Sequence, residues 1–226
     1  MLFHDFTYNM FEFFLLQKRA VTTARALEEG QSKITVPENI EVVFDENNGK
    51  LLLVTGPLSI EDPLEDPVYG ISVRAVKLMK RVQMYQWFEI EDKRDIPAAI
   101  HEGDHDGHIM KTYSYDKDWF DVRIDSETFD NPMGHHNPET WTHNSSLKTN
   151  ARVKIGGFLL GKAVKQKFKD YIPFTSDERP DDRDIKMHAG LYFHSENVWQ
   201  PEVGDVRVHF SYAGKTGELV SYNFTM

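Results

Sequence analysis

The residues best suited to metal chemistry lie close together near the middle of the chain. They are His101, Asp104, His105, Asp106 and His108. Imidazole nitrogens and carboxylate oxygens at such spacings can bind zinc. His101 and His105 would share a face only on a helix, and no glutamate is placed as in the His-Glu-x-x-His motif. Gly103 and Gly107 favour a loop instead. We therefore predict no bound metal, and keep a His-rich, metal-dependent hydrolase built on His101, His105 and His108 as an alternative.

Two other groups of residues have the types needed for catalysis. A second set of histidines, in a segment rich in Gly, Pro and Asn, comprises His135, His136 and His143. There we expect His135 and Asn137 to bond backbone groups of an ordered turn. His194, Ser195 and Glu196 have the types of a nucleophilic triad, but neighbouring residues of a strand point to opposite faces. Because nucleophile-elbow, phosphate-loop and dinucleotide motifs are also lacking, we predict no enzyme activity and no cofactor.

Short apolar or β-branched runs are the elements that would position these side chains. Near the N-terminus they cover Ile34 to Val36, Ile40 to Phe44 and Leu51 to Thr55, and near the C-terminus Leu191 to His194, Val206 to Tyr212 and Glu218 to Phe224. Such runs, separated by signals such as Asn47-Asn48-Gly49, are typical of an antiparallel strand meander.

Ala75 to Glu91 is the longest uninterrupted element. Its apolar and aromatic residues alternate, which predicts a strand with two different faces, although a helix from Ala75 to Tyr85 remains possible. Ile109 to Tyr115 alternates similarly and could pair back onto it, while Trp119 to Ile124 could continue as a strand or edge.

Two segments favour helices. Met10 to Glu29 lacks Gly and Pro and is followed by Gly30, which predicts an N-terminal helix. Phe158 to Tyr171 has apolar residues at helical spacing among several lysines, which predicts an amphipathic basic helix. The fold class predicted is therefore α+β: β-rich antiparallel sheets with these two helices, divided into an N-terminal segment, residues 1–30, and a β-rich domain, residues 31–226.

Composition excludes several classes of protein. The 36 acidic and 26 basic residues give a net charge of −10, which disfavours nucleic acid as a partner. The chain has no cysteine, so disulfides and thiolate chemistry are excluded. Residues 1–16 are apolar but interrupted by His4, Asp5, Asn9 and Glu12, whereas a spanning helix needs roughly 20 mostly apolar residues. We expect this segment to lie on a core or on a membrane surface rather than to span the membrane.

Two sequons for N-glycosylation are present, at Asn144 and at Asn223. Two matches are about what chance supplies among ten asparagines. The sequence therefore leaves open whether either residue is modified.

Several spaced motifs together resemble the LUMA family, transmembrane protein 43. They are Asp66 to Gly70 with Tyr69, Ala75 to Leu78, Val82 to Trp87, Tyr113-Ser114-Tyr115, Asn131 to Pro138 around Gly134-His135, Ser195-Glu196-Asn197, Pro201 to Val208 with Gly204 and Asp205, and Phe210 to Gly214. Arg19 to Gly30 also looks like the segment that follows the family's first membrane helix. The resemblance runs in order from about Arg19 to Gly214.

This resemblance implies a protein of the endoplasmic reticulum and inner nuclear membrane. Family members are similar in having one N-terminal membrane helix, a large hydrophilic domain in the lumen and three C-terminal membrane helices. They organise membrane complexes with emerin and lamins as partners, and have no agreed catalytic residues to transfer. Residues 1–16 are too polar for the first span, and the sequence stops before the later three. We therefore expect either a gene model truncated at both ends or a shortened, soluble paralogue.

The hypothesis is a non-catalytic scaffold domain on the lumenal side, and a homo-oligomer is one form that it could take. Large aromatic side chains concentrate binding energy at interfaces, so the candidate contact residues are Tyr85, Trp87, Tyr113 and Tyr115. The alternative is that these four close the core. Pro201, Gly204, Asp205 and Gly214 are interpreted as residues that make turns. A second functional class, a lipid-binding or lipid-metabolism-linked endomembrane module, is suggested by the apolar N-terminal segment and the basic segment.

Overall fold

The computed structural model describes residues 34–96, 108–177 and 179–225. The contacts divide the chain into two compact units. Of the described residues, the first unit contains 34–59, 152–164 and 216–225, and the second contains 60–96, 108–151, 165–177 and 179–215.

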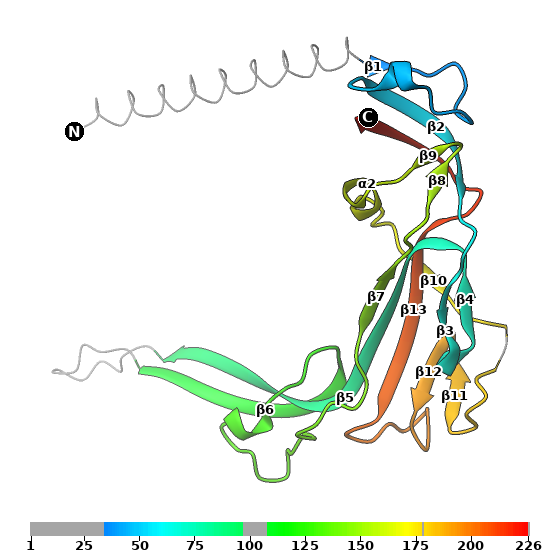
Figure 1. Ribbon diagram of the computed structural model, residues 1–226. Coiled ribbons are helices and arrows are strands. Elements are labelled where there is room, and N and C mark those ends of the chain that lie inside the picture. The colour runs from blue at the N-terminus through cyan, green and yellow to red at the C-terminus, as the bar shows by residue number, and fades with distance from the viewer. Residues whose placement is uncertain (1–33, 97–107, 178, 226) are drawn as a thin grey trace, which may run out of the picture. The chain divides into compact units, whose positions relative to one another are not determined.

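The first unit is a small sheet built around β2, Leu51–Ser59 (Figure 1). The short β1, Ile34–Thr35, pairs with it in parallel, and β14, Leu219–Thr225, pairs antiparallel. The end of β2 pairs with β8, Lys154–Ile155, which forms a hairpin with β9, Phe158–Leu159. Alternate residues of β2 are buried, among them Leu52, Val54 and Leu58. The period of two thus gives this strand one core face and one solvent face.

The segment Ile40 to Phe44 is not a strand, and that prediction is wrong. Val42, Val43 and Phe44 are exposed and lead into the 3-10 turn η1, Asp45–Asn47. The Gly157 N–H donates to the Ile40 carbonyl at 2.8 Å, and a Cβ at Gly156 would lie 2.3 Å from the same oxygen. The segment therefore lies against the β8–β9 turn, where the glycines allow its backbone to approach closely.

The second unit is a seven-stranded antiparallel sheet (Figure 1). Its main order is β11, Ile185–His188; β12, Leu191–His194; β13, Val206–Lys215; β5, Ala75–Ile96; and β6, His108–Phe120. Two shorter strands add to it: β10, Ile172–Phe174, pairs with β13, and β7, Ser146–Thr149, pairs with β5. A separate hairpin of β3, Leu64–Asp66, and β4, Ile71–Val73, encloses the 3-10 turn η2, Pro67–Tyr69.

An aromatic cluster fills the core of this unit. Tyr69, Tyr192 and Phe210 are at most 2 % exposed, and their ring centroids lie 5.2 to 5.8 Å apart. Lys77 is also buried, and its ammonium donates to the Phe168 carbonyl at 2.8 Å. Edge contacts between rings and a bonded ammonium allow this core to be dense without leaving a buried polar atom unsatisfied.

The strand prediction for Ala75 to Glu91 is confirmed, and β5 continues to Ile96. Pairing with β13 ends at Met84, opposite Val206. Pairing with β6 begins at Met84 and continues to Ile96, opposite His108, which confirms the expected return of Ile109 to Tyr115. Within the described residues, the outer part of β5 thus has β6 as its only strand partner.

The predicted α+β class is wrong, because the regular secondary structure of the described residues is almost entirely β. Their helices are α2, Lys162–Gln166, and the 3-10 turns η1, η2 and η3, Ser126–Thr128. The amphipathic basic helix is not formed: its ends lie in β9 and next to β10, and Phe168 is buried. Glycines at 156, 157 and 161 explain the failure, because they favour a tight hairpin and limit the helix to five residues.

The N-terminal helix and the predicted boundary at residue 30 lie outside the described residues. In the ranges that are described, no helix is long and apolar enough to cross a membrane.

Candidate contact surface on the β5–β6 hairpin

The four predicted contact residues lie on one face of the β5–β6 hairpin. The register places Tyr85 opposite Trp119, Trp87 opposite Lys117, Glu89 opposite Tyr115, and Glu91 opposite Tyr113. Residues directly opposite each other in an antiparallel pair have side chains on the same face. We call this the aromatic face: Tyr85, Trp87, Tyr113, Tyr115 and Trp119.

His135 lies against the centre of the aromatic face. Its ring stacks on Tyr115 with centroids 3.9 Å apart and meets Trp87 edge-on at 4.8 Å. Its Nδ1 donates to the Asn131 carbonyl at 3.0 Å. The Lys117 ammonium lies 4.8 Å from the Trp87 ring centroid, a cation–π contact. His135 therefore holds its own loop, residues 121–138, onto the hairpin.

Glu89 is the polar centre of the same face. One carboxylate oxygen accepts hydrogen bonds from the Tyr115 hydroxyl at 2.9 Å and from the Asp130 N–H at 2.6 Å. The Asn131 N–H donates to the Tyr115 oxygen at 2.8 Å. Desolvation raises the pKa of Tyr115; the Asn131 bond opposes this, and Glu89 reinforces it. Tyr115 therefore keeps its proton and remains a donor to Glu89.

Asn137 attaches the end of the loop to the backbone of β5. Its side-chain oxygen accepts from the Trp87 N–H at 2.8 Å, and its side-chain nitrogen donates to the Trp87 carbonyl at 2.9 Å. The expectation that His135 and Asn137 bond backbone groups of an ordered turn is confirmed for His135, whereas Asn137 bonds mainly the backbone of strand β5. On the reverse face, the fully buried Gln86 accepts from the Ile124 N–H and donates to the Val122 carbonyl. The loop is thus held on both faces of β5.

Sequence reasoning missed Glu89 and Gln86. Glu89 resembles any polar residue of an alternating strand, and its role depends on Tyr115, which is 26 residues away. The one available signal for Gln86 was its parity with Met84 and Phe88, which places a polar side chain on the more apolar face of β5.

The inner end of the aromatic face contacts the sheet. Trp119 lies 5.3 Å from Tyr85 and 6.0 Å from Phe193, measured between ring centroids. The Arg207 guanidinium lies 4.7 Å from the Trp119 centroid and donates to Gln83 at 2.8 Å. Tyr85 therefore belongs to the junction with the sheet, whereas Tyr113 lies furthest out and donates to Glu91 at 3.4 Å.

The motif residues from 195 to 205 form a bonded turn beside the junction. One Asp205 oxygen accepts from the Ser195 hydroxyl at 2.7 Å and from the Glu202 N–H at 2.8 Å. The Gly204 N–H donates to the Tyr85 carbonyl, and Gly204 has a φ of 102°, a value that glycine adopts readily. Pro201 lies within this turn, and the exposed Glu196 offers its carbonyl to Lys186.

The triad types at 194 to 196 are not assembled for catalysis. The Ser195 hydroxyl is bonded to Asp205, and His194 Nε2 lies 2.9 Å from the Tyr69 hydroxyl. Tyr69 is held in the core, where burial, with a contribution from Asp66, raises its pKa to about 12. The ring centroids of His194 and His143 are 4.2 Å apart, and desolvation lowers the pKa of both.

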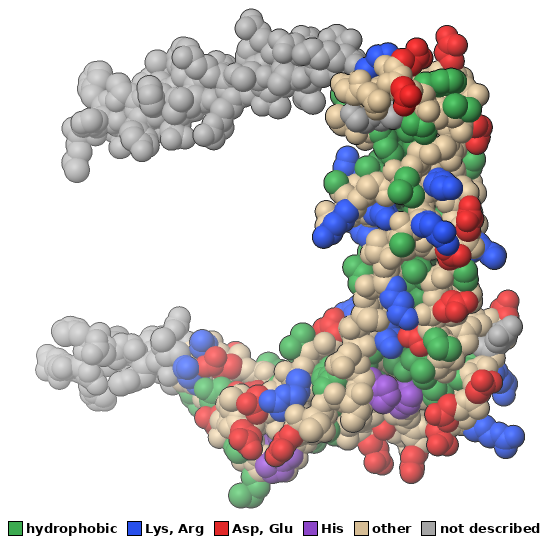
Figure 2. Space-filling model, viewed as in Figure 1, with side chains coloured by type: hydrophobic (Ala, Val, Ile, Leu, Met, Phe, Trp, Pro, Cys, Tyr) green, Lys and Arg blue, Asp and Glu red, His purple; other side chains and the backbone are tan. Residues whose placement is uncertain are grey.

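Metal-ligand side chains do not converge in the part of the chain that the structure describes: no group of three or more could hold an ion. His101 and His105 lie outside the described residues, and for His108 only the backbone pairing with Ile96 is described. Figure 2 shows histidine side chains gathered at two places on the second unit.

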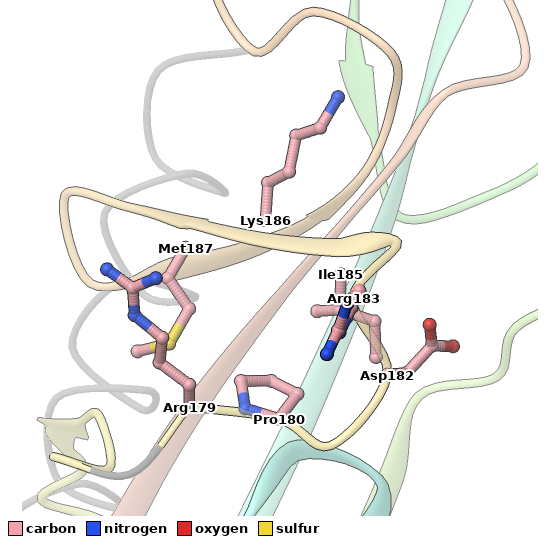
Figure 3. A pocket seen from close by; sticks show the side chains of 7 residues that line it. All are labelled: Arg179, Pro180, Asp182, Arg183, Ile185, Lys186 and Met187. Carbon is pink, nitrogen blue, oxygen red and sulfur yellow. The ribbon is translucent and has the colours of Figure 1, made fainter.

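A pocket with two arginines in its lining lies beside β11 (Figure 3). It has a volume of about 570 Å³ and includes Arg179, Asp182, Arg183 and Met187. Lys186 points away from Met187 in this view and donates to the carbonyls of Ser195 and Glu196. Its ammonium therefore fastens the motif turn and is not directed at a ligand beside the two arginines.

These features define an antiparallel β-sheet protein with a long hairpin that carries an ordered aromatic face. The chain belongs to the transmembrane protein 43 family, whose model matches residues 84–222. It is 38 % identical over 214 residues to the transmembrane protein 43 homolog of Drosophila melanogaster, covering 93 % of this chain and 55 % of that relative. It is 37 % identical over 216 residues to transmembrane protein 43 of Homo sapiens, covering 94 % and 52 % respectively.

The chain therefore spans about half the length of the curated relatives it matches. These relatives carry the name of a membrane protein and not of an enzyme. No solved structure matches the chain.

Proposed function

We propose that this chain is a non-catalytic scaffold domain on the lumenal side of the endoplasmic reticulum and inner nuclear membrane. The observation that supports this proposal is the outer part of the β5–β6 hairpin, which extends beyond the pairing with β13 and carries an ordered aromatic face. Aromatic side chains held in fixed rotamers bind partners with little loss of conformational entropy.

The partner classes come from the family resemblance: emerin-type membrane proteins, lamins and further copies of the chain. A domain in the lumen can touch the lumenal parts of membrane proteins directly. Lamins lie on the other side of the membrane, so such a domain reaches them through those membrane proteins. Membrane-protein contacts are therefore the direct ones in this proposal.

The bonding of the candidate catalytic residues also supports a scaffold. Ser195 is bonded to Asp205, and His194 lies beside Tyr69, so neither is arranged as a nucleophile with its base. The carboxylate of Glu89 is used by Tyr115 and Asp130 to order the loop. The polar groups of the described hairpin thus serve to fix its shape.

The test compares how tightly the unaltered full chain and a hairpin variant bind emerin reconstituted in lipid vesicles. Met110→Ser combined with Tyr113→Ala removes two outer side chains of the hairpin without touching His135 or Asn137. We expect at least about a tenfold loss of affinity. The matched control is Leu159→Ser with Leu219→Ser, which removes exposed apolar side chains of the other unit. Equal affinity of both variants, or no binding and no self-association by the unaltered chain, would contradict the proposal.

A lipid-binding function is the second candidate, supported by the exposed side chains of Lys167 and Lys169 next to α2. Lys165 contributes less, because its ammonium is bonded to the carbonyls of Asn150 and Ala151. Flotation with anionic vesicles tests this function: a lipid-binding module floats at low salt and is released as salt screens its charges. Absence of flotation at low salt rules it out.

A further inference from the structure

The backbone groups of the hairpin alternate in direction, and known bonds fix which residues face outward. The backbone N–H of Tyr85 donates to the Asp205 carbonyl, and the Tyr85 carbonyl accepts from the Gly204 N–H. The odd-numbered residues of β5 therefore direct their backbone N–H and C=O groups toward the β13 side. Their partners across β6 direct theirs away from β5, toward the outer edge. These outward residues of β6 are Lys111, Tyr113, Tyr115, Lys117 and Trp119.

Part of this outer edge is closed by the strand's own side chains. The Asp116 carboxylate accepts the outward N–H of Lys117 at 2.7 Å, and Asp118 accepts that of Trp119 at 2.7 Å. Likewise Asn137 occupies the open edge of β5 at Trp87. Charged or bonded edge residues are a common protection against unwanted strand pairing. Protection of β6 stops at residue 116, and in the described structure no hydrogen-bond partner occupies the outward backbone groups of Lys111, Tyr113 and Tyr115.

We propose that a second copy of this chain pairs with this edge, antiparallel and centred on Tyr113, so that two β5–β6 hairpins form one four-stranded ribbon. This inference rests on the proposed scaffold function and names the element through which the scaffold assembles. Tyr113 would lie opposite Tyr113 of the second copy. Thr112 would lie opposite Ser114, and Lys111 opposite Tyr115, each twice by symmetry.

The residues from 111 to 115 complement themselves in this register. The hydroxyls of Thr112 and Ser114 form a cross-strand pair, and the two tyrosines an aromatic pair, both of which stabilise sheets. No like charges face each other within these five residues. Centring the pair on Ser114 would instead place Lys111 opposite Lys117 twice and would require the N–H that Asp116 already binds. Avoidance of like charges and of the bonded Lys117 N–H therefore favours the register centred on Tyr113 over the one centred on Ser114.

The exposed reverse face gives a physical reason for the pairing. Ile90 and Met110 are 45 % and 50 % exposed on this part of the hairpin. A two-stranded ribbon is marginally stable in water, whereas four strands support one another. Pairing would satisfy the open backbone groups and join the reverse faces into one continuous surface.

The first experiment tests the register by charge. In the pair Thr112→Lys with Ser114→Lys, lysines face lysines across the symmetry axis; in Thr112→Lys with Ser114→Asp, each lysine faces an aspartate. The two variants have the same exposed positions and similar local effects. Sedimentation velocity of the full chain over a range of concentrations should show a dimer at least about tenfold weaker in the first variant than in the second.

The second experiment uses the absence of cysteine from the chain. Tyr113→Cys places a thiol on the symmetry axis, where Cα atoms of a hydrogen-bonded pair are about 5.5 Å apart, within disulfide range. Mild oxidation should give a cross-linked dimer. Lys93→Cys, exposed on the other strand of the hairpin, is the matched control and should remain monomeric.

The outcomes separate this inference from the function on which it rests. A dimer that responds equally to both charge variants, or that is cross-linked through residue 93 and not 113, assembles elsewhere and overturns the inference while the scaffold function stands. A monomeric chain that still binds emerin has the same consequence. A monomer that binds no membrane protein contradicts both.

Discussion

The second unit contains two aromatic clusters that are held together in different ways. Tyr69, Tyr192 and Phe210 are fully buried and pack ring against ring. Tyr115, Trp87 and His135 are half-buried and are joined to polar partners such as Glu89 and Asn131. The comparison teaches that similar residue types stabilise the sheet in one place and fix the shape of a surface loop in the other.

The largest effect should come from the buried cluster. Phe210→Ala removes a fully buried ring that touches both tyrosines, and should lower the free energy of unfolding by about 3–5 kcal/mol. Denaturant titration measures the loss. A change below about 1 kcal/mol would show that this cluster is not the core of the unit.

Asn137→Ala should have a smaller and more local effect. It leaves the Trp87 N–H and carbonyl without their partner, at a cost of about 1–3 kcal/mol. Hydrogen exchange should become faster in the 121–138 loop and remain unchanged in β12 and β13. Asn144→Ala, at an exposed position, is the control. Uniformly faster exchange would mean that the surface cluster is not independent of the core.

Acid should weaken the histidine pair that adjoins the buried cluster at Tyr69. The folded-state pKa of His143 and of His194 lies below the ordinary 6.5, so the unfolded chain binds protons first as pH falls. The contribution of the two neutral histidines to the free energy of unfolding is complete above pH 6.5 and decreases below it. Lys80 adds to this effect at His143, whereas Asp182 opposes it at His194. The unfolding free energy should therefore fall as the pH decreases below 6.5, and less so in His194→Gln. A profile independent of both histidines would contradict this assignment.

The smallest effect is expected outside both clusters, at the exposed ion pair of Arg81 and Asp121. Their charged atoms are 2.7 Å apart, and both side chains are about half exposed. Arg81→Ala should change the unfolding free energy by about 0–1 kcal/mol, and less at high salt. Thermal denaturation at two salt concentrations measures this, and a larger loss would assign Arg81 a role in holding β5.

The sequence predicts the elements whose signals are local. Alternation identified β5 as a strand and placed Tyr85 and Trp87 on one face, because parity alone determines the face. The same kind of evidence failed at Phe158 to Tyr171, where helical spacing competed with Gly156, Gly157 and Gly161, and tertiary packing of Phe168 decided the outcome.

The surface cluster could be predicted only in part. His135 and Asn137 were expected to bond backbone groups, since such loops are rich in turn residues. Their partners were not predictable, because Trp87 is 50 residues from Asn137, and because the bond from Tyr115 to Glu89 depends on strand register. Long-range register is the information that a single sequence lacks.

The continuity of β5 has a mechanical consequence. The same uninterrupted backbone is paired with β13 from Ala75 to Met84 and forms the hairpin beyond it. Tension applied to the hairpin along the strand would pass directly into that ladder and load its hydrogen bonds in shear, all at once, instead of opening them one by one. A partner that pulls on the hairpin would therefore act on a rigid element that is anchored in the centre of the sheet.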